Sequence, residues 1–252
     1  VESRSDATAD IRPESDTKGL VVQTSTHARS QVDGCAGCHA RRGRLTIDPI
    51  PGAAFLDQYR PALLRPGLYH ADGQILDEVF VYGSFAQSKM YRAGVACSDC
   101  HGVHDLKVPT GDDVCLGCHN PMPPRERFPS LADKARDYAS PEHHHHPAGG
   151  DGSACVDCHM VERNYMVIDP RGDHSFRVPR PDLTEAIGTP NACNGCHDDR
   201  SATWAVEHVA SWFGDRPDHY GATLAAARAG RASIADLAQL ASDVRTPGIA
   251  RA

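Results

Sequence analysis

One signature, Cys-x-x-Cys-His, occurs five times and constrains this chain more than any other feature. The five copies use all ten cysteines of the sequence. Two thiols three positions apart can add to the two vinyl groups of one porphyrin while the adjacent imidazole binds the iron, which is c-type haem attachment. The sequence therefore predicts five haem c groups, attached at Cys35, Cys38 and His39; Cys97, Cys100 and His101; Cys115, Cys118 and His119; Cys155, Cys158 and His159; and Cys193, Cys196 and His197.

Three other interpretations of the ten cysteines fit less well. Disulfides would not place a histidine after every second cysteine, and with 15 histidines in 252 residues five such coincidences have a chance of about one in a million. Zinc sites need two pairs, or a pair with two further ligands, and five histidine-tailed pairs do not divide into such sets. Thioredoxin-like motifs occur singly within a βαβ pattern, which is missing from this sequence.

The composition predicts a fold organised around its cofactors. The chain has about 50 residues per haem, and its content is only 40% apolar and 6% aromatic. The porphyrins must therefore supply much of the buried surface. We expect a mainly α fold with extensive irregular coil, a closely packed haem chain and very little β structure. We expect a polar N-terminal arm (1–30), a pentahaem cytochrome domain (31–200) and a C-terminal helical segment (201–252).

Charge and hydropathy predict an exported protein without a transmembrane segment. The formal net charge is −7 and the basic residues are scattered, so nucleic acid is not an expected partner. No apolar run approaches the 18 or more residues of a membrane helix. Haem is attached to such motifs outside the cytoplasm, so we expect a removed signal peptide and a periplasmic or extracellular location. The expected partners are redox proteins or other copies of this chain.

Each of the five irons also needs a ligand on its second face, and the histidines outside the motifs are the candidates. His27 precedes the first motif by eight residues, and His70 lies beside a turn signal. His104 lies three residues after His101, a span of at most about 10 Å, so it must serve a different haem. Because the chain has four methionines against ten histidines outside the motifs, we expect ligation by two histidines throughout.

Two further candidates lie around the fourth motif. The run 143–146 consists of four histidines, and adjacent side chains of an extended segment point to opposite faces. One or two members are therefore expected to bind iron; His143, His145 and His146 are the candidates, and the sequence does not decide between them. His174 follows the motif between turn residues and an aromatic residue.

Local patterns predict mostly short elements. Helices are expected at about 53–64, from Ser84 through Met90, and at 130–138, with a β-like alternating stretch at 75–82. Beyond the fifth motif, an amphipathic helix is expected at 201–213, with alanine-rich helices at 222–229 and 233–244. His208 shares a stripe with Trp204 and Trp212 and is interpreted as a packing residue.

Several stretches resemble a group of bacterial multihaem c-type cytochromes whose members carry tetratricopeptide or HEAT-like repeats after the haem domain. They are the five motifs, the stretch 82–91 (YGSFAQSKMY), the run 143–146 and the stretch 173–176 (DHSF). About 24–215 is covered, and more distantly this region is similar to pentahaem nitrite reductases and to the tetrahaem cytochromes of ammonia oxidisers. The resemblance implies low-spin haems in close-packed pairs, with second ligands at His27, His70, His104, the 143–146 run and His174.

One departure from this resemblance bears on function. Nitrite reductases of this type usually carry a lysine in place of one motif histidine, and all five motifs here keep histidine. We expect an electron carrier rather than an enzyme, acting alone or as a subunit of an extracellular cytochrome filament. The alternative is a multihaem oxidoreductase that reduces a small nitrogen or sulfur species at one five-coordinate haem.

Overall fold

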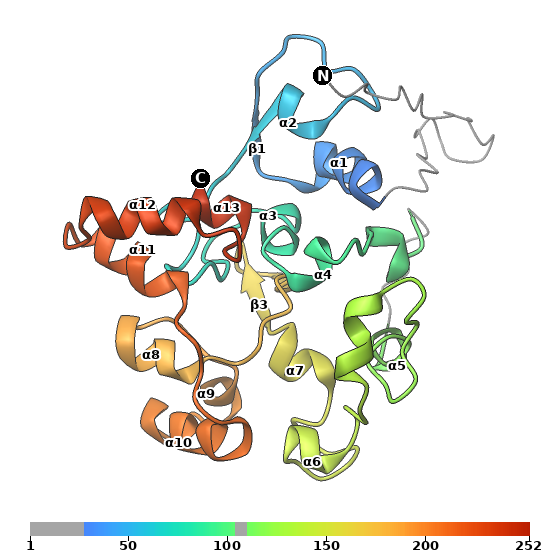
Figure 1. Ribbon diagram of the computed structural model, residues 1–252, viewed down its shortest axis with the longest axis vertical. Helices are drawn as coiled ribbons and strands as arrows, with labels where there is room; N and C mark the ends of the chain where they lie inside the picture. Colours follow the sequence, from blue (N-terminus) through green and yellow to red (C-terminus); the bar gives the residue numbers. More distant parts are fainter. Residues whose placement is uncertain (1–27, 104–109) are drawn as a thin grey trace.

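The structure is a computed structural model that describes residues 28–103 and 110–252. Two predicted iron ligands, His27 and His104, lie outside the described residues. Short helices joined by long irregular segments make up most of the described chain (Figure 1). The α-helices before the last motif are α1 (Ala28–His39), α2 (Phe55–Gln58), α3 (Tyr82–Phe85), α4 (Lys89–Arg92), α5 (Asp113–Leu116), α6 (Pro141–His144), α7 (Cys155–His159) and α8 (Pro181–Ile187).

The β structure of the described residues consists of two small antiparallel hairpins. Strand β1 (Arg42–Arg44) pairs with β2 (Tyr59–Pro61), and β3 (Glu162–Tyr165) pairs with β4 (Asp169–Gly172). The expected fold class, mainly α with extensive coil and very little β, is confirmed.

From the fifth motif onward the chain forms successive helices joined by short connections. The last helices are α9 (Cys193–Cys196), α10 (Ala202–Phe213), α11 (Tyr220–Arg228), α12 (Ile234–Ser242) and α13 (Gly248–Arg251). Ser201 and Ser233 cap α10 and α12, because each hydroxyl accepts a hydrogen bond from a backbone N–H of the first turn. The helices expected at 201–213, 222–229 and 233–244 are therefore present. Both α10 and α11 pack on α8.

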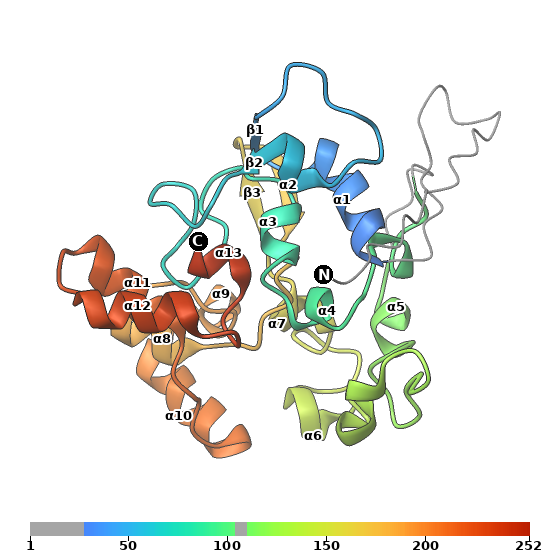
Figure 2. The same cartoon turned by 45° about the horizontal axis from the view of Figure 1, so that its top comes forward.

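Two small apolar clusters hold the described elements together. One is built around α1, α2 and α3 and includes Val32, Phe55 and Phe85. The other joins the irregular segment 64–79 to the C-terminal helices and includes Tyr69 and Val79. Figure 1 shows α1 and α2 at one end of the molecule and α10 at the other, with α7 and β3 between them, and Figure 2 likewise shows α7 between the two ends. Neither cluster is large, as expected for a chain whose cofactors supply buried surface.

Four local predictions were wrong in whole or in part. The alternating stretch 75–82 is not a strand, because Ile75 and Val79 bury their side chains in the second cluster while the backbone makes only an isolated bridge from Ile75 to Tyr69. The helix expected from Ser84 is interrupted: Ser88, not Ser84, caps α4 by accepting from the N–H of Tyr91. Over 130–138 the structure has the 3₁₀ helix η2 (Pro129–Lys134), which begins at a proline. The helix expected at 53–64 is reduced to α2, and the chain continues as β2.

No helix in the described ranges is both long and apolar enough to cross a membrane.

Candidate functional site

Each Cys-x-x-Cys-His motif is folded as about one helical turn. The motifs lie at the end of α1, in the 3₁₀ helix η1 (Cys97–Asp99), at α5, in α7 and in α9. In the second, third and fifth motifs the histidine N–H donates to the carbonyl of the first cysteine, as in His101 to Cys97 at 3.0 Å. Residues i and i+3 of a helical turn share a face, so the two thiols of a motif lie on one side.

Three motif histidines face a second histidine at the same separation. The ring centroids are 6.1 Å apart in the pairs His101 and His174, His159 and His143, and His197 and His146. The ring planes of these pairs differ by 27°, 8° and 29°. In each of the three pairs, therefore, a motif histidine meets a histidine from outside the motifs.

This separation fits two imidazoles that share one metal ion. With about 2.0–2.1 Å from metal to nitrogen and about 1.1 Å from nitrogen to ring centre, two opposed rings have centres about 6.2–6.4 Å apart. Rings in direct contact lie closer, as His145 and Trp212 do at 4.0 Å. No group of three or more histidine, cysteine or acidic side chains converges as a metal-binding cluster within the described part of the chain. The paired imidazoles thus fit an iron held by a porphyrin and two histidines.

Backbone carbonyls orient several of these imidazoles. The Nδ1 atom of His159 lies 2.7 Å from the carbonyl oxygen of Arg177, that of His174 lies 3.0 Å from Gly172, and that of His146 lies within hydrogen-bond distance of His144. A hydrogen bond donated by Nδ1 leaves Nε2 as the free ligand atom and fixes the ring, as is usual for metal-binding histidines.

The four histidines of the run 143–146 lie in different surroundings. It begins in α6, and His145 then adopts a left-handed backbone with φ of 57°, which turns the chain. As a result, His143 faces the fourth motif and His146 the fifth. The ring of His145 instead lies flat on Trp212, and Nε2 of His144 lies 3.2 Å from the carbonyl of Ala139.

The attachment sites follow one another in space in the order of the chain. The thiols of Cys35 and Cys97 are in hydrogen-bond contact, which joins motifs one and two, and those of Cys115 and Cys155 join motifs three and four. Electrostatic contacts link the remaining neighbours: Cys100 is close to Cys115 and Cys118, and Cys158 to Cys193 and Cys196. Each of the five sites therefore adjoins the next one along the chain.

The ten cysteines are free thiols whose pKa values differ. None of the ten forms a disulfide, and burial raises the pKa of the Cys158 thiol to about 11. Hydrogen bonds with Cys97 and Cys155 lower the pKa of Cys35 and Cys115 to about 7. Both of these hydrogen bonds join thiols of two different motifs, whereas a thioredoxin-like site activates a thiol within one Cys-x-x-Cys pair.

The third motif is linked to the fourth by an aromatic side chain that the sequence did not single out. The phenol ring of Tyr138 meets the ring of His119 edge to face at 5.8 Å and that of His143 at 4.9 Å. Its hydroxyl donates to the carbonyl of Lys134 at 2.8 Å. His119 is also within electrostatic range of His159. Tyr138 thus fills the space between two neighbouring sites.

His70 lies away from the described histidine pairs. It lines a cavity of about 390 Å³ together with Tyr69, Thr189 and Arg228. Its Nε2 atom is buried without a hydrogen-bond partner, and burial lowers the pKa of its imidazole. The structure brings no motif histidine of the described residues to pair distance of His70.

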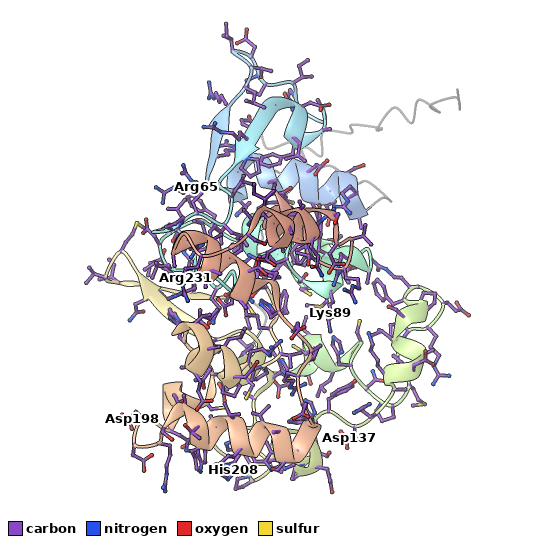
Figure 3. All side chains as sticks on the ribbon, turned by 60° about the vertical axis from the view of Figure 1, so that its left-hand side comes forward. Arg65, Lys89, Asp137, Asp198, His208 and Arg231 are labelled. Atoms are coloured by element: carbon purple, nitrogen blue, oxygen red, sulfur yellow. The ribbon has the colours of Figure 1, made fainter. Side chains whose placement is uncertain are left out.

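Helix α10 covers the fifth motif and the histidine run. The ring of Trp204 lies 4.9 Å from that of His197, and Phe213 contacts both His143 and His145. His208 packs against Trp204, in agreement with its interpretation as a packing residue. Figure 3 shows His208 on α10 at one end of the molecule, with Asp198, which directly follows the fifth motif, nearby at that end.

Comparisons with known proteins identify the kind of fold. No family model matches the chain, and no curated protein matches it. The structure is similar to the crystal structure of the outer cell wall cytochrome OcwA, with a TM-score of 0.51 and 17% sequence identity over 77% of this chain and 53% of that one. The chain thus spans about half the length of that cytochrome. Together with the five motifs, this likeness shows that the chain has a multihaem cytochrome-like fold.

Proposed function

We propose that this protein transfers electrons along five haem c groups attached at its five motifs. The observation that carries the proposal is the set of three histidine pairs with ring centroids 6.1 Å apart. Each iron would supply a one-electron couple between its ferric and ferrous states. In each pair the two imidazoles would hold the iron from both faces, which would leave no position for a substrate at those three irons.

The remaining ligands extend the same proposal. For the irons of the first and third motifs, His27, His104 and His70 stay the candidate second ligands from the sequence. His174 is within electrostatic range of His39 as well as His101, so the first two sites are close neighbours. We assign second ligands to the other three motifs as His174 for the second, His143 for the fourth and His146 for the fifth.

The contacts between successive attachment sites support electron transfer from the first motif to the last. The second cysteine is exposed in the first motif, at Cys38, and in the last, at Cys196, whereas the other eight cysteines are partly buried. The first and last motifs thus each carry one exposed cysteine. The protein's part is to fix the spacing of the sites and to tune each iron through its ligands, hydrogen bonds and burial.

The location and partners follow from this function. Haem attachment requires export, so the protein works in the periplasm or outside the cell. Its partners are redox proteins or further copies of this chain, and copies joined at their exposed terminal sites would form a conductive filament. The structurally similar OcwA is an outer cell wall cytochrome, which is in keeping with an extracellular role for this chain.

An oxidoreductase is the second candidate, and the third motif is where it would act. In the described residues, the phenol ring of Tyr138 lies against the ring of His119. The hydroxyl of Tyr138 donates a hydrogen bond to the backbone carbonyl of Lys134. A phenol beside an iron can donate a proton to a bound substrate. Reduction of a small nitrogen or sulfur species would need this iron to keep an open position.

Two measurements test the proposal. The mass of the intact protein should exceed that of the polypeptide by five haems. Electron paramagnetic resonance of the oxidised protein should show only low-spin ferric signals, because the proposal gives each of the five irons two imidazoles. A high-spin signal from one iron would favour the oxidoreductase, and a colourless protein would overturn both candidates.

A further inference from the structure

A six-residue segment after the fourth motif contacts the histidines of two different motifs. Within residues 172–177, His174 faces His101 of the second motif, and the carbonyl of Arg177 accepts from Nδ1 of His159 of the fourth motif at 2.7 Å. The backbone path of this segment therefore places the ring of His174 directly and orients the ring of His159 through a hydrogen bond.

The backbone of this segment is strained. Phe176 has φ of 47°, a left-handed conformation that a bulky L residue rarely adopts. Its ring packs edge to face on Phe85, with centroids 6.4 Å apart, and on His174 at 5.7 Å. Strain of this kind persists where the surroundings over-determine the conformation, and it concentrates at functional sites.

The side chain of Arg177 anchors the end of the segment. Its guanidinium donates to the carbonyl of Asp72 at 2.8 Å and to Oε1 of Gln87 at 2.9 Å. The hydroxyl of Tyr220 reaches the same two acceptors, at 2.7 and 2.8 Å. We call these four residues the Arg177 node. Because Tyr220 begins α11, the node connects the C-terminal helices to the hydrogen bond on His159.

One geometric feature sets the fourth motif apart. The rings of His159 and His143 differ in plane by 8°, against 27° and 29° in the other two pairs. His159 is the motif histidine whose Nδ1 is bound to the Arg177 carbonyl. A ring with one nitrogen on the iron and the other on a fixed carbonyl cannot rotate freely.

We propose that Arg177 is a positioning residue for His159 and that Tyr220 acts through Arg177, so that the node holds the two axial rings of the fourth site nearly parallel. This inference rests on the proposed haem ligation. The relative angle of two axial imidazoles sets the anisotropy of a low-spin ferric signal, and nearly parallel rings give a rhombic one. The fourth site should therefore give the most sharply defined rhombic signal of the three assigned pairs.

The test uses the holoprotein with all its haems and compares three variants with a control. In Arg177→Gln and Tyr220→Phe, the rhombic signal of the fourth site should broaden and its largest g-value should rise. The haem content should stay unchanged, as should the signal of the fifth site, whose histidine pair includes no residue of the segment 172–177. The spectrum of Arg177→Lys should lie between those of the wild type and Arg177→Gln, since lysine keeps the positive charge without the two-pronged guanidinium group. Arg180→Gln is the control, because Arg180 bonds Asp182 within its own segment and should change nothing.

The outcomes separate this inference from the proposed function. Wild-type protein without low-spin signals would overturn the proposed function itself. Wild-type protein with those signals, and unchanged spectra in both variants, would overturn only the role of the node. If Arg177→Gln fails to assemble, Tyr220→Phe decides alone, because it removes one hydroxyl and leaves the guanidinium in place.

Discussion

The imidazole of His143 faces that of His159 with ring centroids 6.1 Å apart and planes within 8° of parallel. Two residues to the C-terminal side, His145 lies flat on Trp212 instead. Neighbouring histidines of one run therefore have different roles, and this difference can be measured.

We predict that His143→Ala converts one low-spin iron to high spin, because the fourth site loses its second imidazole. His145→Asn is the matched control, since it removes an imidazole from the same run without touching a motif histidine, and asparagine tolerates the left-handed backbone at this position. Electron paramagnetic resonance of the two oxidised variants provides the measurement. Equal spectra for the two variants would contradict the assignment of His143.

We predict that Gly152→Ala disturbs the fifth site. Gly152 has φ of 78°, and a Cβ there would meet the ring of His146 at 2.8 Å, so the ring must shift away from His197. Gly149 also has a positive φ, of 70°, but its Cβ would meet nothing within 4 Å. Gly149→Ala therefore carries the same backbone strain without the clash. The high-spin fraction of the iron signal should rise in Gly152→Ala alone. A rise of the same size in Gly149→Ala would show that backbone strain, and not the clash with His146, is the cause.

We predict that Asp112→Ala lowers the free energy of unfolding by about 1.5 kcal/mol, since a hydrogen bond to a charged group contributes about that much. Oδ1 of Asp112 accepts from the N–H of Cys155 at 2.9 Å, which ties the third motif to the fourth. Asp113→Ala alters an exposed neighbour and serves as control. Denaturant unfolding followed by circular dichroism measures both. Equal losses would show that this bond adds no stability.

We predict that the protein loses stability as the pH falls from about 6.5 to about 4, in part through His219. Burial, and then the charge of Arg177, lower the pKa of His219 from 6.5 to about 4. The unfolded chain therefore takes up a proton in this interval before the folded one does, which favours unfolding by up to about 3 kcal/mol at the lower pH.

The variant His219→Asn isolates this contribution. Nδ1 of His219 accepts from the N–H of Gly221 at the start of α11, and asparagine can supply the same cap without titrating. Between pH 7 and pH 4.5 the free energy of unfolding should fall less in the variant than in the wild type. Parallel losses would show that other groups account for the pH dependence.

The sequence predicted the parts of this molecule that depend on local chemistry. Helices α10 and α12 follow from alanine-rich or amphipathic stretches behind the capping residues Ser201 and Ser233. The small β content followed from the density of motifs. The stretch 75–82 was misread because alternating apolar residues can pack into a cluster without a partner strand.

The arrangement of the candidate site depends on contacts that no local pattern encodes. The separation of His143 from His146 arises from the left-handed turn at His145, and nothing in four identical residues indicates where such a turn falls. Tyr138 and the carbonyl of Arg177 were missed because their roles depend on long-range folding. His174 was a candidate from its turn context, but its pairing with His101 required the structure. The assignments of His27, His70 and His104 stay predictions.

Attachment sites that are neighbours along the polypeptide are also neighbours in space, as the contacts of Cys35 with Cys97 and of Cys115 with Cys155 illustrate. A chain with this organisation can mature progressively during export, because each newly completed section finds its neighbour already in place. It can also lengthen in evolution by duplicating one section at an end, without re-threading the rest.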